Sequence, residues 1–278
     1  MTMVEQIHHP APVFSSLDEI EPRVSSCAQI ALFLDFDGTL STIVPHPTDA
    51  QLDPHIRSML KVLTARPDFT VAVVSGRALK DVRQRVGLTD VIYVGNHGLE
   101  IESDSICFRE PEAETLRREL RSLSLQLKLA LCDTDGLEVE DKGLTLSVHF
   151  RRVTENLHDW VRSVTLSTVG RSRSFSCREG KMVIEVKPQV DWHKGHAIKW
   201  IAREVLPASS LSIYIGDDVT DEDAFAAIPE GITIRVGEAA ETHARYLLSD
   251  VVAVGQFLHW LDHAKPHASI ANSQRAGR

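Results

Sequence analysis

The chain has 278 residues, of which 43% are hydrophobic and 25% charged, an ordinary globular composition with room for one large or two modest domains. The net charge of −9 disfavours a sequence-independent nucleic-acid binder, which needs a basic surface, and no segment approaches the roughly 18 consecutive apolar residues of a membrane span. Four scattered cysteines without a CxxC pair predict neither disulfides nor a zinc site, and they suit a reducing cytoplasm.

The N-terminal half of the chain shows the pattern of an α/β fold. Residues 1–27 lack the apolar core of a secretory signal, and we expect them to form a flexible tail. Residues 31–40 (ALFLDFDGTL) form an apolar run that ends in turn residues, which is typical of a buried parallel strand. A helix at 53–65, a strand at 69–74, a helix at 79–86 and a strand at 91–94 follow. This alternation predicts a doubly wound parallel sheet.

The pattern changes at residues 106–187. A long helix at 112–131, a hairpin at 137–150, a helix at 155–169 and a second hairpin at 172–187, turning at Glu179 and Gly180, give the order αββαββ. We therefore predict an α+β domain at 106–187, inserted into a core formed by residues 28–105 and 188–264.

After the insertion the core pattern resumes. We expect a helix at 193–205, a strand at 211–215, a helix at 220–227 and a strand at 232–236. A helix at 241–248, a short strand at 251–254 and a last helix at 256–263 complete the core, before a C-terminal tail at 265–278.

The first strand ends in two aspartates, Asp35 and Asp37, separated by one residue. In open α/β sheets the ligand crevice lies outside the carboxyl ends of the strands, so both carboxylates are expected in a site. Carboxylates this close repel each other unless a cation lies between them, and Mg²⁺ suits such a site. The Asp-Gly pair could instead mark a β-hairpin, but Pro45 and Pro47 do not continue an antiparallel ladder.

This pattern suits phosphoryl transfer through an aspartyl-phosphate. Asp35 would be the nucleophile, and Asp37 would protonate the leaving oxygen and later activate water. The amides around Phe36 and Gly38 would hold phosphate oxygens. An aspartate two residues after the nucleophile indicates a phosphatase or a phosphomutase, because the leaving group of a kinase or ATPase has less need of a proton.

Two further segments contribute single residues. Ser75, after the second strand, would donate its hydroxyl to a phosphate oxygen, although a simple turn residue is the alternative. Lys194, at a predicted helix start, would neutralise the phosphate and orient Asp35, although an isolated lysine is usually solvated surface.

The acidic loop at 216–225 (GDDVTDEDAF) supplies the remaining metal ligand. We expect Mg²⁺ to be held by Asp35, the backbone carbonyl of Asp37 and Asp217, with Asp218 and Asp221 supporting the loop. A calcium EF-hand does not fit, because the loop lacks its glycine and its twelfth-position glutamate.

Together DFDGT (35–39), SGR (75–77), HKGHA (193–197) and GDDVTDEDAF resemble the four motifs of the haloacid dehalogenase-like (HAD) phosphatases, over residues 30–260. More narrowly, GNHG (95–98), VEDKGLTLSVHFR (139–151), EGKMVIEV (179–186) and the acidic loop are similar to the trehalose-6-phosphate phosphatase family. The resemblance implies an HAD-like core whose αββαββ insertion is a cap, and Mg²⁺-dependent cleavage of trehalose 6-phosphate to trehalose and phosphate.

The resemblance also implies the residues that contact substrate. These are the phosphate-site residues Asp35, Phe36 and Asp37, the core residues Arg77, Asn96 and His97, and the cap residues Glu140, Lys142, Arg151, Lys181 and Glu185. For Lys142 and Lys181, ordinary hairpin-turn chemistry is the alternative explanation.

Several alternatives stay open. They are a phosphatase for sucrose phosphate or mannosylglycerate phosphate, a phosphomutase, and a non-catalytic sugar-phosphate sensor, against which the intact aspartates argue. We expect a cytoplasmic monomer that binds a small sugar phosphate and neither nucleic acid nor a membrane. A trehalose-6-phosphate synthase would be a separate partner.

Overall fold

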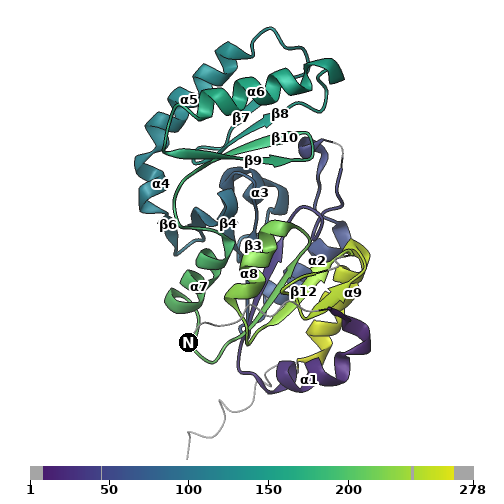
Figure 1. Ribbon diagram of the computed structural model, residues 1–278. Helices are drawn as coiled ribbons and strands as arrows, with labels where there is room; N and C mark the ends of the chain where they lie inside the picture. The colour runs from purple at the N-terminus through teal and green to yellow at the C-terminus, as the bar shows by residue number, and fades with distance from the viewer. Residues whose placement is uncertain (1–8, 45, 239–240, 266–278) are drawn as a thin grey trace, which may run out of the picture.

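The computed structural model describes residues 9–44, 46–238 and 241–265, and these ranges contain two β-sheets, one above the other in Figure 1. The larger sheet has nine strands in the order β1-β13-β12-β11-β2-β3-β4-β5-β6. These strands are β1 (Ala11–Pro12), β2 (Ile30–Asp35), β3 (Phe69–Val74), β4 (Ile92–Gly95), β5 (Glu100–Glu102), β6 (Cys107–Arg109), β11 (Leu211–Gly216), β12 (Ile232–Val236) and β13 (Tyr246–Leu248).

The centre of the larger sheet is parallel, as the sequence predicted. Strand β2 lies between β11 and β3, and its Leu34 pairs with Ile215 on one side and Val73 on the other. Only β5 and β6 are antiparallel to their neighbours within this sheet of the described chain. The polar segments that follow β2, β3 and β11 therefore share one edge of the sheet.

Alternate residues of the central strands point to opposite faces of the sheet and form two apolar layers. One face packs against helices α1 (Leu17–Ser26), α2 (Pro54–Thr64), α3 (Leu79–Val86) and α9 (Val251–Ala264), through residues such as Leu32 and Leu34. The other face, with Phe33 and Tyr214, packs against α7 (Lys194–Glu204) and α8 (Glu222–Ala227). Helices on both faces make the core the doubly wound α/β fold expected from the sequence.

The smaller sheet is antiparallel, with four strands in the order β7-β8-β10-β9. The inserted segment comprises α4 (Pro111–Thr115), α5 (Arg117–Ala130), β7 (Glu138–Asp141), β8 (Leu146–His149), α6 (His158–Val169), β9 (Phe175–Gly180) and β10 (Val183–Pro188). Helices α5 and α6 cover its upper face, where Leu127, Val161 and Ile184 form a core, and the other face turns toward the larger sheet (Figure 1). We call residues 111–188 the insert.

Short 3-10 helices occupy some connections. They are η1 (Val13–Ser15), η2 (Pro47–Asp49), η3 (Asn96–Gly98), η4 (Glu155–Leu157) and η5 (Val219–Asp221). Within the described ranges, none of the helices has the length and apolarity of a membrane span.

The expectation of a flexible tail at 1–27 is wrong for the part that the structure describes. Strand β1 adds to the edge of the large sheet beside β13, and α1 packs against α9. Val13, Ile20 and Val24 are fully buried, so these apolar residues anchor the segment to the core. Residues 1–8 lie outside the described ranges, as do residues 266–278 of the predicted C-terminal tail; Lys265 is buried.

Three boundaries also differ from expectation. Residues 107–109, which the predicted insert at 106–187 included, form β6, which pairs with β5 and belongs to the large sheet. The second hairpin turns at Lys181 and Met182, because Gly180 is already paired with Val183 and Met182 takes the positive φ of 62°. In place of a helix at 241–248 and a strand at 251–254, the chain forms β13 and then α9, which begins where Asp250 Oδ1 accepts the amide of Ala253 at 2.9 Å.

Candidate active site

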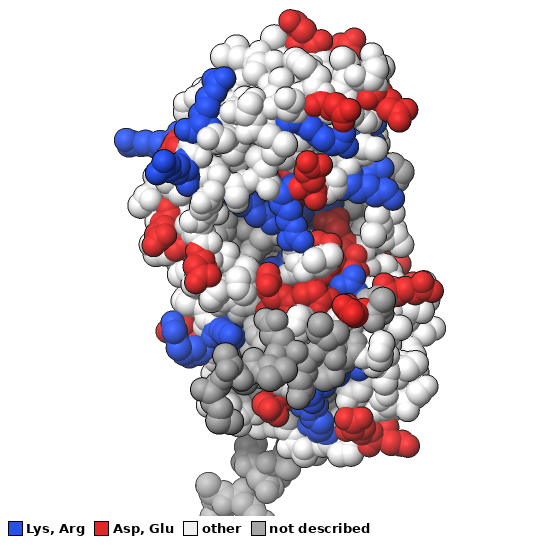
Figure 2. Space-filling view, in the orientation of Figure 1, with Lys and Arg blue, Asp and Glu red and all other residues white. Residues whose placement is uncertain are grey.

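A cavity of about 360 Å³ lies at the carboxyl edge of the large sheet, beneath the insert. The core lines it with Asp35, Asp37, Ser75, Arg77, His97, Lys194, Asp217 and Asp218, and the insert with Glu140, Lys142, Ser147, His149 and Glu185. Figure 2 shows a hollow between the upper and lower parts of the molecule, bordered by basic side chains above and acidic ones below. Most of the residues predicted for the site thus meet around one cavity.

Asp35 is the central residue of this site. It ends β2, is 4% exposed, and accepts a hydrogen bond from Lys194 Nζ to its Oδ1 at 2.6 Å. Burial raises the pKa of Asp35 well above its usual value, the charges of Asp221 and Asp217 add to this, and Lys194 opposes it. The Oδ2 atom accepts no hydrogen bond from the described residues, so one oxygen remains available for chemistry.

Lys194 is fixed by two carboxylates. Its Nζ donates to Asp35 Oδ1 at 2.6 Å and to Asp221 Oδ1 at 2.7 Å, and the side chain is 2% exposed. Burial opposes its charge, but Asp221 and Asp35 outweigh that and raise the pKa of Lys194 above its ordinary value. Lys194 is therefore a permanent buried cation, rather than the solvated residue that was the alternative.

Asp221 links Lys194 to the acidic loop. It is fully buried, its Oδ1 also accepts the hydroxyl of Tyr214 at 2.6 Å, and its Oδ2 accepts the amide of Asp218 at 2.9 Å. Asp218 in turn closes a capping box with Asp221 and accepts the Thr220 hydroxyl at 3.1 Å. Both residues hold the acidic loop in shape, the role expected from the sequence.

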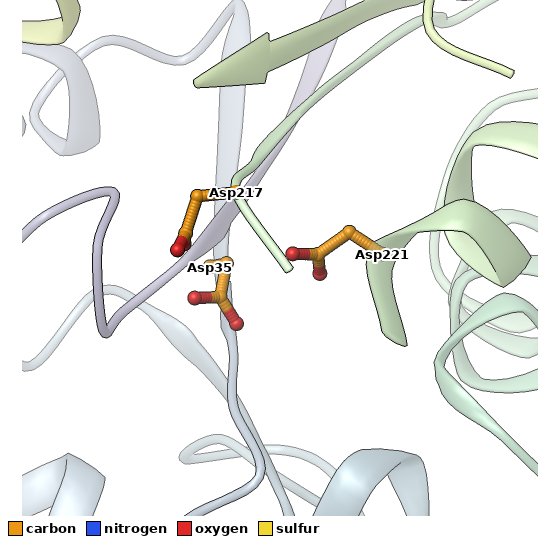
Figure 3. A group of neighbouring side chains, drawn as sticks. All are labelled: Asp35, Asp217 and Asp221. Carbon is orange, nitrogen blue, oxygen red and sulfur yellow. The ribbon is translucent and has the colours of Figure 1, made fainter. Parts of the chain in front are cut away.

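The residues fit a hard divalent cation. Carboxylate oxygens of Asp35, Asp217 and Asp221 all lie within 4.8 Å of one another, and the three side chains converge in Figure 3. Burial, followed by the charge of Asp221, raises the pKa of Asp217 to about 7, so the protein alone leaves negative charge there uncompensated. Because Asp221 already accepts three hydrogen bonds, Asp35 and Asp217 are the carboxylates best placed to hold Mg²⁺.

Gly38 allows the first motif to approach the acidic loop. Its φ is +87°, and a Cβ there would lie 2.0 Å from Asp217 Oδ2. Only glycine fits this close approach without displacing a candidate metal ligand.

Asp37 is held by an arginine. Arg77 donates from Nε to Asp37 Oδ2 at 2.7 Å and from Nη2 to Oδ1 at 2.6 Å, and its Nη1 reaches Asp81 at 2.8 Å. The guanidinium lies over the ring of Phe36, 5.5 Å from its centroid. Phe36 is fully buried, so its side chain supports Arg77 and does not reach the cavity.

Ser75 and His97 line the core side of the cavity. Ser75 is 1% exposed and its Oγ accepts the amide of Arg77 at 3.2 Å. His97 Nε2 lies 3.2 Å from Glu185 Oε1 of the insert, and burial lowers the pKa of His97 to about 4. The histidine is therefore neutral and joins the two parts of the molecule.

The expected substrate contact of Asn96 is not supported. Asn96 is fully buried, and its Nδ2 donates to Glu100 Oε2 at 2.6 Å and to the carbonyl of Lys142 at 3.0 Å. Its Oδ1 accepts the hydroxyl of Thr145 at 2.6 Å. The amide is thus occupied by protein groups and fastens the insert to the core.

A second cavity of about 450 Å³ continues outward from the first. Arg151 and Lys181 line it, and Arg151 Nη2 donates to the carbonyl of Lys181 at 3.2 Å. The two cavities share Val44, Arg77, Glu140, His149 and Val183. The cap residues expected to bind sugar therefore divide into an inner group, Glu140, Lys142 and Glu185, and an outer group, Arg151 and Lys181.

The inner group is tied together by charge. Glu185 lies 3.8 Å from Lys142 Nζ and 3.0 Å from Lys187 Nζ, and Lys142 also donates to the carbonyl of Gly76 at 3.2 Å. Burial raises the pKa of Glu185, but His97 and the two lysines outweigh this and hold it below its usual range. Glu185 is therefore an ionised hydrogen-bond acceptor facing the cavity.

Sequence reasoning missed several residues around the site. Tyr214, Asp81 and Lys187 hold Asp221, Arg77 and Glu185, and the hydroxyl of Thr39 lies 3.1 Å from Asp217 Oδ1. His149 and Ser147 line the cavity from β8, and their alternation in LSVH was the available signal.

Known proteins resemble this chain over most of its length. The family model described as trehalose-phosphatase matches residues 33–248. The chain is 36% identical over 239 residues to the trehalose-phosphate phosphatase of Mycobacterium tuberculosis, covering 82% of this chain and 60% of that protein. It is 34% identical over 274 residues to a trehalose 6-phosphate phosphatase of Zea mays, covering 90% and 75%. The chain therefore spans only about 60% of the length of the mycobacterial relatives.

Solved structures have the same fold. A crystal structure of a trehalose-6-phosphate phosphatase related protein superposes with a TM-score of 0.73 at 26% identity, covering 84% of this chain and 97% of that one. The C-terminal domain of Candida albicans trehalose-6-phosphate phosphatase gives 0.75 at 20% identity, covering 93% and 100%, a likeness that concerns the fold alone.

Proposed function

Because the chain belongs to the trehalose-phosphatase family, we propose that it is a phosphatase that hydrolyses trehalose 6-phosphate to trehalose and phosphate. The observation that carries the proposal is the buried contact between Lys194 and Asp35 in a cavity whose opposite wall belongs to the insert. A nucleophile and a phosphate-neutralising cation face a wall of hydrogen-bonding side chains, as a sugar phosphate requires.

The reaction would take place at Asp35 in two displacements. An oxygen of Asp35 attacks phosphorus, and the bond from phosphorus to the sugar oxygen breaks. Asp37 gives its proton to the departing oxygen, then accepts a proton from the water that attacks the aspartyl-phosphate. This second displacement releases phosphate and restores the Asp35 carboxylate.

The other residues have supporting roles. Lys194 holds the orientation of Asp35 and offsets phosphate charge, while the hydroxyl of Ser75 and the amides after Asp35 donate to phosphate oxygens. Mg²⁺, held by Asp35, Asp217 and the backbone carbonyl of Asp37, would neutralise further phosphate charge when bound. Arg77 fixes the position of Asp37 through Nε and Nη2 and lines the same cavity.

The insert would act as the cap that selects the sugar. Glu140, Lys142 and Glu185 line the cavity nearest Asp35, and Arg151 and Lys181 line its outward continuation. The continuity of the two cavities supports a disaccharide phosphate over a monosaccharide phosphate, because a second sugar ring has its own polar surroundings.

The test is phosphate release from a panel of trehalose 6-phosphate, glucose 6-phosphate, sucrose 6-phosphate and mannosylglycerate phosphate, with Mg²⁺ or with EDTA. We expect strong preference for trehalose 6-phosphate, lost in EDTA. Asp35→Asn should abolish release while the thermal unfolding curve stays cooperative, and the exposed Asp133→Asn serves as its control. Preference for another sugar would reject the substrate, and an active Asp35→Asn variant would reject the nucleophile.

A further inference from the structure

The face of the insert that turns toward the active site contains a row of side chains on β8 without an assigned role. Residues Ser147 and His149 lie two apart on this strand, so they point to the same side of the sheet. Their neighbours Leu146 and Val148 are fully buried in the apolar core on the other side. Both Ser147 and His149 line the inner cavity, and His149 also lines the outer one.

The sheet register places this row between the two carboxylates of the wall. Ser147 pairs with Glu140 of β7 on one side and with Glu185 of β10 on the other. His149 follows at the junction of the two cavities, opposite Val183. A sugar that extends from the inner to the outer cavity must therefore pass over β8.

His149 is bonded on one nitrogen only. Its Nε2 lies 2.9 Å from Glu140 Oε2. Burial raises the pKa of Glu140, but His149 and Lys142 outweigh this and lower it, so the carboxylate is ionised and accepts the hydrogen bond. With a proton on Nε2, a neutral imidazole leaves Nδ1 as an acceptor and a protonated imidazole makes Nδ1 a donor, and the described residues supply no partner to Nδ1 in either case.

Ser147 gives a second, independent indication of a ligand. The residue is 1% exposed, and its Oγ has no hydrogen-bond partner among the described residues. A buried hydroxyl without a partner costs free energy, yet this one borders a polar cavity that has room for a ligand. A hydroxyl can both donate and accept, so it complements a sugar hydroxyl in either orientation.

We propose that Ser147 and His149 are specificity-determining residues that hydrogen-bond the hydroxyl groups of the sugar at the junction of the two cavities. His149 hydrogen-bonds the sugar through Nδ1 and, through Nε2, holds Glu140 as an acceptor. Ser147 supplies a donor between the carboxylates of Glu140 and Glu185. The assignment rests on the proposed function of this site, and it adds two residues to the set implied by the family resemblance.

The experiment compares His149→Leu, His149→Gln and Ser147→Ala on trehalose 6-phosphate and on 4-nitrophenyl phosphate, which has no sugar. We expect His149→Leu to raise KM for the sugar phosphate about tenfold and Ser147→Ala several-fold, with kcat within about twofold. His149→Gln should have a KM between those of the wild type and His149→Leu, because the side-chain amide of glutamine can still donate to Glu140. His259→Leu, the same change at an exposed position of α9, should match the wild type.

A Glu140→Gln background separates the two contacts of His149. If Nδ1 of His149 hydrogen-bonds the sugar directly, adding His149→Leu to the Glu140→Gln variant still raises KM. Unchanged KM in both His149→Leu and Ser147→Ala would overturn the proposal, and so would equal losses on 4-nitrophenyl phosphate. Failure of the wild-type protein to cleave trehalose 6-phosphate would instead count against the proposed function, and the sugar phosphate that it does cleave would replace it in the same comparison.

Discussion

Arg77 and Asp37 form a two-pronged ion pair, with Nε and Nη2 of the arginine 2.7 and 2.6 Å from the two carboxylate oxygens. This geometry holds the proposed general acid–base toward α3, because Asp81 fixes the same guanidinium at 2.8 Å. Lysine cannot reproduce a planar fork, so it is not a conservative replacement here.

Replacing Arg77 should therefore affect chemistry more than folding. We expect Arg77→Lys to lower kcat/KM for both trehalose 6-phosphate and 4-nitrophenyl phosphate by about 10- to 100-fold, because Asp37 loses its fixed position. The matched control is Arg83→Lys, which alters an arginine of α3 that pairs with Glu102 outside the cavity. Wild-type kcat/KM in Arg77→Lys would show that this pair has no part in turnover.

Two glycines with positive φ test the approach of the first motif to the acidic loop. Gly38→Ala would place Cβ 2.0 Å from Asp217 Oδ2, whereas a Cβ at Gly237 (φ +78°) meets no atom within 4 Å. Both substitutions carry the backbone strain of about 1–2 kcal/mol. We expect only Gly38→Ala to lose phosphate release, by at least about 100-fold. Equal activity of the two variants would contradict the close approach.

The buried His97 predicts a pH dependence of stability. Burial lowers its pKa from 6.5 to about 4 in the folded protein, where Glu185, Lys142 and Lys187 surround it. At this residue the unfolded chain therefore binds more protons between these values, and the contribution of His97 to the free energy of unfolding falls as pH drops from about 6.5 to 4. At 1.36 kcal/mol per pKa unit the loss is on the order of 3 kcal/mol.

Urea unfolding at pH 7.0, 6.0, 5.0 and 4.5 measures this effect. His97→Gln keeps a hydrogen-bond donor toward Glu185 but does not titrate, so the wild-type protein should lose stability relative to this variant as the pH falls over the same range. The pKa of Glu185 is held below its usual value, so its contribution is lost only at lower pH, as the pH falls below about 4.5. A variant with the same slope as the wild-type protein would assign the pH dependence to other groups.

The acidic cluster predicts stabilisation by Mg²⁺ that is independent of turnover. A cation that binds only the folded state raises its stability by RT ln(1 + [L]/Kd). We expect Mg²⁺ at about 100 times its Kd to add about 2.7 kcal/mol to the free energy of unfolding relative to EDTA. Asp217→Asn should remove this increase, whereas Asp223→Asn, an exposed acid of α8, should keep it. Retained stabilisation in Asp217→Asn would place the cation elsewhere.

The sequence was sufficient to predict the central strands of the large sheet, because their apolar pattern matches their place in the fold. The apolar run before Asp35 has no helical period, and both its faces are buried in the parallel sheet. The prediction of a strand at 251–254 was wrong because the four apolar residues at Val251–Val254 suit a strand or the first turn of a helix equally well. The Asp250 cap and the partners of α9 decide between them.

The site residues also divide into those whose role a local motif predicts and those whose role depends on tertiary packing. Asp35, Lys194 and Asp217 carry recognisable motifs, and the shared edge of the strands brings them together. The roles of Asn96 and His149 depend on which residues of the insert face them, and that is fixed by the β7–β8 register and by the packing of the insert on the core. The alternation in LSVH indicates only the face of β8 on which His149 lies, and no local pattern gives the partners of either residue.

Asn96 fastens one side of the insert, with three buried hydrogen bonds of which two cross to Lys142 and Thr145. Breaking them would leave polar groups unsatisfied, at about 1–3 kcal/mol for each group. A rotation of the insert relative to the core therefore keeps these hydrogen bonds only if its axis passes close to Asn96.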